Sequence, residues 1–222
     1  PTGQVANYRE TPMISPWSTN PDTTVNRPWV FRAAFLDPFQ GRVMASFVQE
    51  EFGAQTAAVL YDIASDYPKG LAENFRDAAE ANGIEVVGFE SFTTGDTDFS
   101  SQLTNILRQN PDVIFAPQYY NEVPLIVQQA RELGYENPIV GSDSWGTPDL
   151  IELCGEACNG LFFSTHYAPD IATEVGQAFI TAYEAEYGAK PDDVAALTYD
   201  AFQLLFRAIE DAGSLERADI RD

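Results

Sequence analysis

The sequence has few basic residues and no long apolar run. No run approaches the roughly 18 residues that a membrane span needs, so we expect no membrane insertion. Against 34 acidic residues there are only 12 basic ones, a formal net charge of -22 over 222 residues. That charge repels phosphate backbones and anionic headgroups, which disfavours binding to nucleic acid or to a membrane surface. The acidity either simply keeps the surface soluble or steers a cationic ligand.

Catalytic signatures are also missing. The sequence has no G-x-S-x-G elbow, Walker A loop, G-x-G-x-x-G turn or H-E-x-x-H pair. Its single histidine, His166, suits a structural or hinge-lining role better than that of a general base. Two cysteines and one histidine do not have the number and spacing of zinc ligands. The sequence therefore predicts no enzyme, no cofactor and no metal site.

The two cysteines, Cys154 and Cys158, are four positions apart. A local disulfide at the end of a helix is favoured, because a small loop containing Gly155 could bring the sulfurs together, and it would indicate an oxidising compartment. Two unpaired thiols remain the alternative. A redox-active pair is disfavoured because the C-x-x-C spacing is absent.

A regular alternation of short apolar runs with amphipathic segments begins at Thr56. It predicts parallel strands connected by helices, and 45% hydrophobic residues suffice for a globular core. The expected strands are 57–61, 84–89, 112–117, 138–141 and 161–163. The expected helices are 69–82, a segment from 99 to 107 opened by Asp98, a stripe from Val123 to Ala130, and a helix beginning at Thr147. Together they predict a doubly wound α/β domain over 37–166.

The flanking segments follow a different pattern. Residues 12–15 form one expected short strand and 29–35 another apolar run, with no helix between them, whereas 174–187 and 194–212 are long amphipathic helices. These elements do not make a balanced domain, so we expect 1–36 and 167–222 to form part of a second lobe whose other strands are missing. Because the chain begins at Pro1 without an initiator Met, we expect a shortened N-terminus, and the lack of a signal peptide is uninformative.

Ligands of open α/β sheets bind beyond the carboxyl ends of the strands. Hydroxyls or carboxylates occur there together with aromatic rings, in segments 15–20, 62–67, 118–121 and 142–145. Helix capping and turns explain part of this polarity but not the aromatic rings. The mixture predicts a cleft that binds a small organic solute.

Several segments resemble one family, the branched-chain amino-acid-binding type of type I periplasmic solute-binding protein. The resemblance is carried in order by Pro12–Pro21, Phe31-Arg32, Asp37–Gly41, Tyr67–Gly70, Gly95–Phe99, Tyr119–Glu122 and Gly141–Asp143. It implies a two-lobed flytrap, apparently truncated at both ends, that closes by hinges near 36–38 and 166–169. It further implies a periplasmic or extracellular protein that delivers an amino acid or similar solute to an ABC permease. A ligand-sensing receptor ectodomain with the same fold is the alternative.

The resemblance also implies residue roles. Thr19, together with Ser18 and the backbone of Trp17, matches the positions at which family members bind the ligand's α-carboxylate and ammonium groups. Tyr67 and one of Tyr119 or Tyr120 match aromatic contacts from the other lobe, and Asp143 matches the acid that pairs with the ammonium. Asp143 is shorter than the usual Glu, and Trp17 and Trp145 add bulk, so an aromatic, amide or other solute could replace leucine. A further family serine would precede Pro1, and final strands are expected after Asp222.

Overall fold

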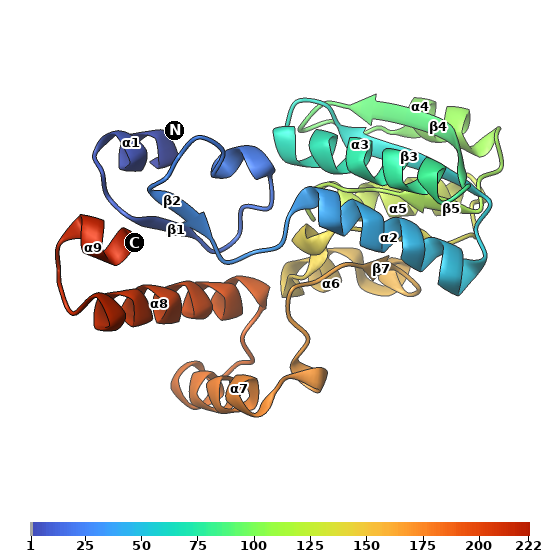
Figure 1. Ribbon diagram of the computed structural model, residues 1–222. Helices are drawn as coiled ribbons and strands as arrows, with labels where there is room; N and C mark the ends of the chain where they lie inside the picture. The colour runs from blue at the N-terminus through green and yellow to red at the C-terminus, as the bar shows by residue number, and fades with distance from the viewer. Residues whose placement is uncertain (1) are drawn as a thin grey trace. The chain divides into compact units, whose positions relative to one another are not determined.

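The computed structural model describes residues 2–222, which divide into two compact units. One unit comprises the chain up to Leu36 together with His166–Asp222, and the other comprises Asp37–Thr165. The chain thus crosses from one unit to the other twice, between residues 36 and 37 and between residues 165 and 166 (Figure 1).

The unit Asp37–Thr165 is built on a five-stranded parallel sheet with the order β4-β3-β5-β6-β7. The strands are β3 (Thr56–Asp62), β4 (Glu85–Phe92), β5 (Val113–Phe115), β6 (Ile139–Gly141) and β7 (Phe162–Phe163). Every strand predicted from the alternating pattern is present, and the doubly wound α/β class is confirmed. The strand order reverses direction at β3 and β5, which is the place where such sheets bind ligands.

Helices cover both faces of this sheet (Figure 1). One face packs against α2 (Asp37–Phe52) and α3 (Asp66–Ala81), through a core that includes Val48, Leu71 and Phe75. The other face packs against α4 (Ser100–Leu107), α5 (Val123–Glu132) and α6 (Pro148–Cys154). Because the central strands are buried on both sides, their sequences are continuously apolar and do not alternate.

The predicted helix starts differ in how closely they match. Thr147 caps α6 as expected, since its Oγ1 accepts from the backbone N–H of Asp149 at 3.3 Å. Asp98 accepts from the N–H of Ser100 at 2.9 Å, but Phe99 occupies the N-cap position of α4. Helix α2 had no counterpart in the sequence analysis. It begins at Asp37 and Pro38, residues that commonly open a helix.

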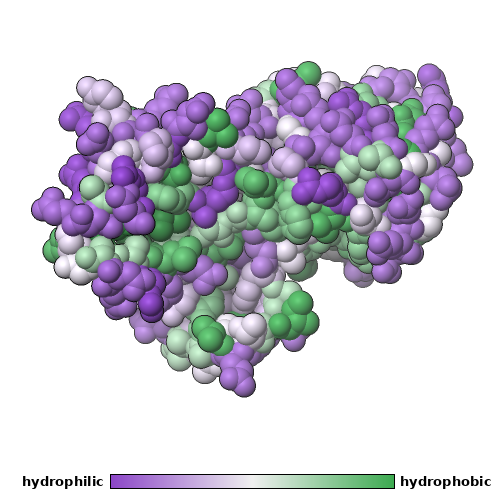
Figure 2. All heavy atoms as spheres, viewed as in Figure 1, coloured by the Kyte–Doolittle hydropathy of each residue, from purple (hydrophilic) through white to green (hydrophobic). Residues whose placement is uncertain are grey.

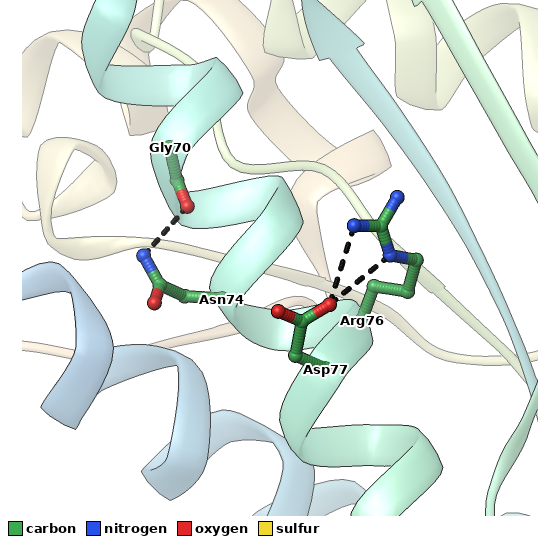
Figure 3. Close-up of polar contacts among 4 residues, drawn as sticks. All are labelled: Gly70, Asn74, Arg76 and Asp77. Carbon is green, nitrogen blue, oxygen red and sulfur yellow. Dashed lines mark hydrogen bonds and ion pairs between the residues drawn. The ribbon is translucent and has the colours of Figure 1, made fainter.

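Helices α2 and α3 approach each other closely at Gly41. A Cβ atom at this position would lie 2.8 Å from the backbone of Asn74 and Phe75. Figure 3 shows Asn74 turned along its own helix, where its Nδ2 donates to the carbonyl of Gly70 at 2.7 Å, while Arg76 pairs with Asp77. This close approach packs the part of α2 beside Gln40 against the middle of α3, the helix whose first turn carries Tyr67.

The other unit contains a two-stranded parallel sheet, β1 (Met13–Ser15) with β2 (Val30–Arg32). Its helices are α1 (Thr2–Tyr8), α7 (Glu174–Tyr187), α8 (Asp193–Ala212) and α9 (Arg217–Arg221), with a 3₁₀ turn at Pro169–Ile171. The two long helices were predicted, whereas α1 and α9 were not. The expectation of no helix between the two strands β1 and β2 was wrong, because one 3₁₀ turn, Pro21–Thr23, lies between them and is capped by Asn20.

Helices α7 and α8 expose large apolar side chains. Phe202, Leu204 and Phe206 on α8 are each about half exposed, and Val175 on α7 is more exposed still. Figure 2 shows hydrophilic residues over much of the face in view and apolar residues gathered over the region of α7. No helix within 2–222 has both the length and the apolar character that a membrane crossing needs.

Candidate ligand-binding site

A buried carboxylate, Asp143, lies at the centre of the candidate site in the unit Asp37–Thr165. It opens the 3₁₀ turn Asp143–Trp145 directly after β6 and is only 1% exposed. Its Oδ1 accepts hydrogen bonds from the hydroxyl of Tyr67 at 2.5 Å and from Nε2 of Gln40 at 2.6 Å. Side chains from α2, α3 and the β6 loop therefore meet at the carboxyl edge of the sheet, and their charge-assisted bonds orient the carboxylate.

The environment of Tyr67 keeps its phenol neutral. Burial raises the pKa of Tyr67 well above its ordinary value, and the charge and hydrogen bond of Asp143 raise it further, whereas hydrogen bonds with Ser142 and Ser144 act in the opposite direction. Tyr67 is therefore a hydrogen-bond donor to Asp143 throughout the physiological pH range.

Trp145 is packed as a core residue of this unit. It is 1% exposed, and its Nε1 donates to the carbonyl of Gln118 at 3.1 Å. Ser144 Oγ donates to the same carbonyl at 2.7 Å. The indole ring occupies the space beside Gly141, where a Cβ would come within 2.2 Å of the ring. These contacts make Trp145 a support for the Gln118 and Asp143 loops.

Tyr119 and Tyr120 have different surroundings. The ring of Tyr119 lies 5.4 Å from that of Tyr67, and this residue is 44% exposed. Tyr120 packs partly against the core under α5 and α6, and a hydrogen bond to Asp149 raises its pKa. Of the two tyrosines that the resemblance left open, the structure brings Tyr119 to Tyr67.

Asp62 has a structural role in the turn after β3. Its Oδ1 accepts from the backbone N–H groups of Ala64 at 2.8 Å and Thr94 at 3.1 Å, and its Oδ2 accepts from the Thr94 hydroxyl. Asp62 thus ties the turn after β3 to the end of β4.

In the other unit, Trp17, Ser18 and Thr19 follow β1. The Trp17 ring lies 5.9 Å from that of His166, which stacks on Phe35 at 3.6 Å with nearly parallel planes. Ser18 Oγ is 2.8 Å from the hydroxyl of Thr23, and Thr19 is buried. His166 therefore takes part in an aromatic stack.

Arg32 holds this loop in place, a role that the sequence analysis missed. Its guanidinium donates to three carbonyls and one hydroxyl, at distances of 2.7 to 3.0 Å, and the acceptors are Ser18, Asn20, Pro21 and Thr24. Arg32 is the last residue of β2, so it lies outside the strand-end segments from which the candidate site residues came.

Two glutamines were also missed as site residues. Gln40 belongs to the motif Asp37–Gly41, but its contact depends on α2, which had not been predicted. Gln118 lies within one of the strand-end loops and was not distinguished from the other polar residues there. Both are 1% exposed. A predicted helix beginning at Asp37 would have brought Gln40 to the same sheet edge.

The two cysteines form a disulfide in the structure. Cys154 ends α6 and Cys158 ends the following 3₁₀ turn, Gly155–Cys158. Both side chains pack against the core that includes α5 and α6. Over residues 2–222, His, Cys, Asp and Glu side chains form no group of three or more that could hold a metal ion.

The doubly wound sheet, with ligand-type side chains at its carboxyl edge, has the architecture of a type I periplasmic binding protein. The family model described as periplasmic binding protein matches residues 1–222. The chain belongs to this family, and its resemblance to the branched-chain amino-acid-binding type is confirmed.

Three relatives illustrate the similarity. A leucine-binding protein structure from Thermotoga maritima shares 41% identity at a TM-score of 0.94, covering 99% of this chain and 63% of that one. A branched-chain amino acid transporter substrate-binding protein from Streptococcus pneumoniae, in complex with isoleucine, shares 35% identity at a TM-score of 0.86, covering 98% and 62%. The leucine-specific-binding protein of Salmonella typhimurium is 28% identical, covering 94% and 56%. The chain thus spans just over half of that curated relative.

Proposed function

We propose that this protein is the extracytoplasmic solute-binding component of an ABC importer and binds an amino acid without transforming it. The observation that carries the proposal is the buried carboxylate of Asp143, held by Tyr67 and Gln40. The α-ammonium group of an amino acid would donate charge-assisted hydrogen bonds to a carboxylate held in this way. Related proteins have names or structures that record leucine or isoleucine as ligand, which supports the same class of solute.

The hydrogen bonds around Asp143 favour this assignment. Tyr67 and Gln40 are neutral donors, and both orient the carboxylate through Oδ1. We propose that Asp143 accepts from the ligand's ammonium, that Tyr119 packs beside the ligand with Tyr67, and that Trp145 supports the site from the core. Trp17, Ser18 and Thr19 remain proposed ligand contacts, and Tyr120 is a weaker candidate because it engages Asp149.

The proposal includes the protein's setting and partners. Family membership and the disulfide agree with an oxidising extracytoplasmic compartment, and a permease would receive the loaded protein. The names of the related proteins describe binding proteins, which supports binding without turnover.

Calorimetry on the full-length protein tests this proposal. L-leucine, L-isoleucine and L-valine are titrated beside 4-methylpentanoate, which is leucine without its amine. We expect saturable binding of the amino acids and a loss of at least about tenfold for the amine-free analogue, because the analogue lacks the ammonium group that would donate to Asp143. If no amino acid binds, or if the analogue binds equally well, the proposal is contradicted.

A further inference from the structure

The side-chain amide of Gln118 is buried and has no hydrogen-bond partner among the residues that the structure describes. The residue is 1% exposed, and neither its Nε2 nor its Oε1 has a hydrogen-bond partner within residues 2–222. Its backbone carbonyl, in contrast, accepts from both Ser144 and Trp145. The main chain at Gln118 is thus firmly held, whereas the hydrogen-bonding capacity of the buried amide is unused within residues 2–222.

Such an amide is unfavourable in the ligand-free protein. A carboxamide can donate two hydrogen bonds and accept two, and burying it without partners sacrifices those that it would make to water. Buried polar groups of native proteins are nearly always satisfied, so an unsatisfied one indicates an ordered water or a functional partner.

Hydrogen bonds connect Gln118 to the Asp143 cluster. The Ser144 hydroxyl that donates to the Gln118 carbonyl also interacts with the hydroxyl of Tyr67, which in turn donates to Asp143. Within the same cluster, Oε1 of Gln40 is likewise buried and has no hydrogen-bond partner in the described part of the chain. The residue that carries the unsatisfied amide is therefore joined through its backbone carbonyl to the polar cluster in which the proposed amino-acid site lies.

We propose that Gln118 selects the ligand's side chain and favours a carboxamide, as in asparagine or glutamine. Two carboxamides form a pair of antiparallel N–H to O hydrogen bonds, which would satisfy both Nε2 and Oε1. An aliphatic side chain would leave both atoms unpaired, and sites built around such groups discriminate strongly against analogues that lack the partner. A side-chain carboxylate would meet the negative charge of Asp143. This inference rests on the proposed amino-acid site.

The test compares L-asparagine with L-leucine, whose side chains have nearly the same shape. In calorimetry on the full-length protein we expect asparagine to bind at least about tenfold more tightly. Gln118→Met, which keeps the length of the side chain but removes the amide, should abolish this preference. The same substitution should raise the melting temperature of the ligand-free protein, because an unsatisfied polar group is removed from the interior.

Gln129→Met is the matched control. The Gln129 amide is satisfied on both sides, by the N–H of Phe99 at 2.7 Å and the carbonyl of Thr97 at 2.8 Å. Its replacement should lower the melting temperature and leave the ratio of the two affinities unchanged.

Three outcomes would count against the inference in distinguishable ways. Equal or tighter binding of leucine by the wild type would refute amide selection while leaving amino-acid binding intact. An asparagine preference that survives in Gln118→Met would assign selection to another residue, with an ordered water as the partner of Gln118. Failure of every amino acid to bind would overturn the proposed function and this inference with it.

Discussion

Replacing Gly141 with alanine should destabilise the unit Asp37–Thr165 through a steric clash with Trp145. The new Cβ would lie 2.2 Å from Cδ2 and Cε2 of the indole ring, which is buried and has no room to withdraw. Overpacking of a core typically costs about 1–3 kcal/mol. If the ring shifts, its hydrogen bond to the Gln118 carbonyl is also lost, at about 1 kcal/mol. Together these terms predict a loss of about 2–4 kcal/mol.

Urea denaturation of four proteins separates this clash from other effects. They are the wild type, Gly141→Ala, Trp145→Leu and the double variant. With the smaller leucine in place, Gly141→Ala should cost less than about 1 kcal/mol, so the two substitutions should be strongly non-additive. Gly88→Ala in β4 serves as the control, because its Cβ would meet Ala58 at 3.3 Å, a mildly tight contact, and Ile106 at 3.5 Å, an ordinary one. Additive costs, or an equal cost at Gly88, would refute the reasoning.

Three further predictions concern stability. Hydrogen bonds from the N–H groups of Gln55 and Thr56 lower the pKa of Asp112 in the folded protein. The ionised Asp112 therefore stabilises the fold at pH values above its pKa in the unfolded chain, near 3.9, and this stabilisation is lost as the pH falls through its pKa in the folded protein. Asp112→Ala should therefore lower the free energy of unfolding, measured with urea, by about 1 kcal/mol at pH 7 after allowance for solvent screening, and by much less at pH 3. An equal difference between variant and wild type at the two pH values would contradict this. Arg32→Lys should lower the free energy of unfolding by about 1–3 kcal/mol and speed proteolysis within residues 18–24, because an ammonium group cannot replace the four guanidinium contacts. An unchanged rate of cleavage would show that Arg32 does not hold this loop. The intact mass without reductant should be lower by two hydrogens than the mass after reduction, and finding the dithiol mass without reductant would show that the disulfide does not form. Cys154→Ser should lower the free energy of unfolding by about 2 kcal/mol.

The repeating α/β pattern could be predicted from the sequence because it depends on signals carried by neighbouring residues. Apolar runs such as 57–61, and helix boundaries such as Thr147, carry their information within a few residues. Helix α2 escaped because the residues that it buries include polar and small ones, among them Gln40 and Gly41. Its place in the fold depends on close packing with α3, which sequence spacing does not encode.

The site was predictable only in part for the same reason. Asp143 and Tyr67 were named from the resemblance, and the structure joins them directly. Trp145 is also at the predicted strand end, but its exposure depends on rotamer and packing, and its ring is turned into the core. The choice between Tyr119 and Tyr120 as the partner of Tyr67 likewise required the structure. The two tyrosines are adjacent in the sequence, and only the direction of each side chain decides which one lies beside Tyr67.

The central claim is that the Asp143 carboxylate pairs with the ligand's ammonium group. A thermodynamic cycle tests it most directly, with calorimetry of wild type and Asp143→Asn against L-leucine and 4-methylpentanoate. Asparagine at this position keeps the shape and removes the charge. The account predicts that leucine loses about 2–5 kcal/mol of binding free energy while the amine-free analogue is little affected. An equal loss for both ligands, or unchanged leucine affinity, would contradict it.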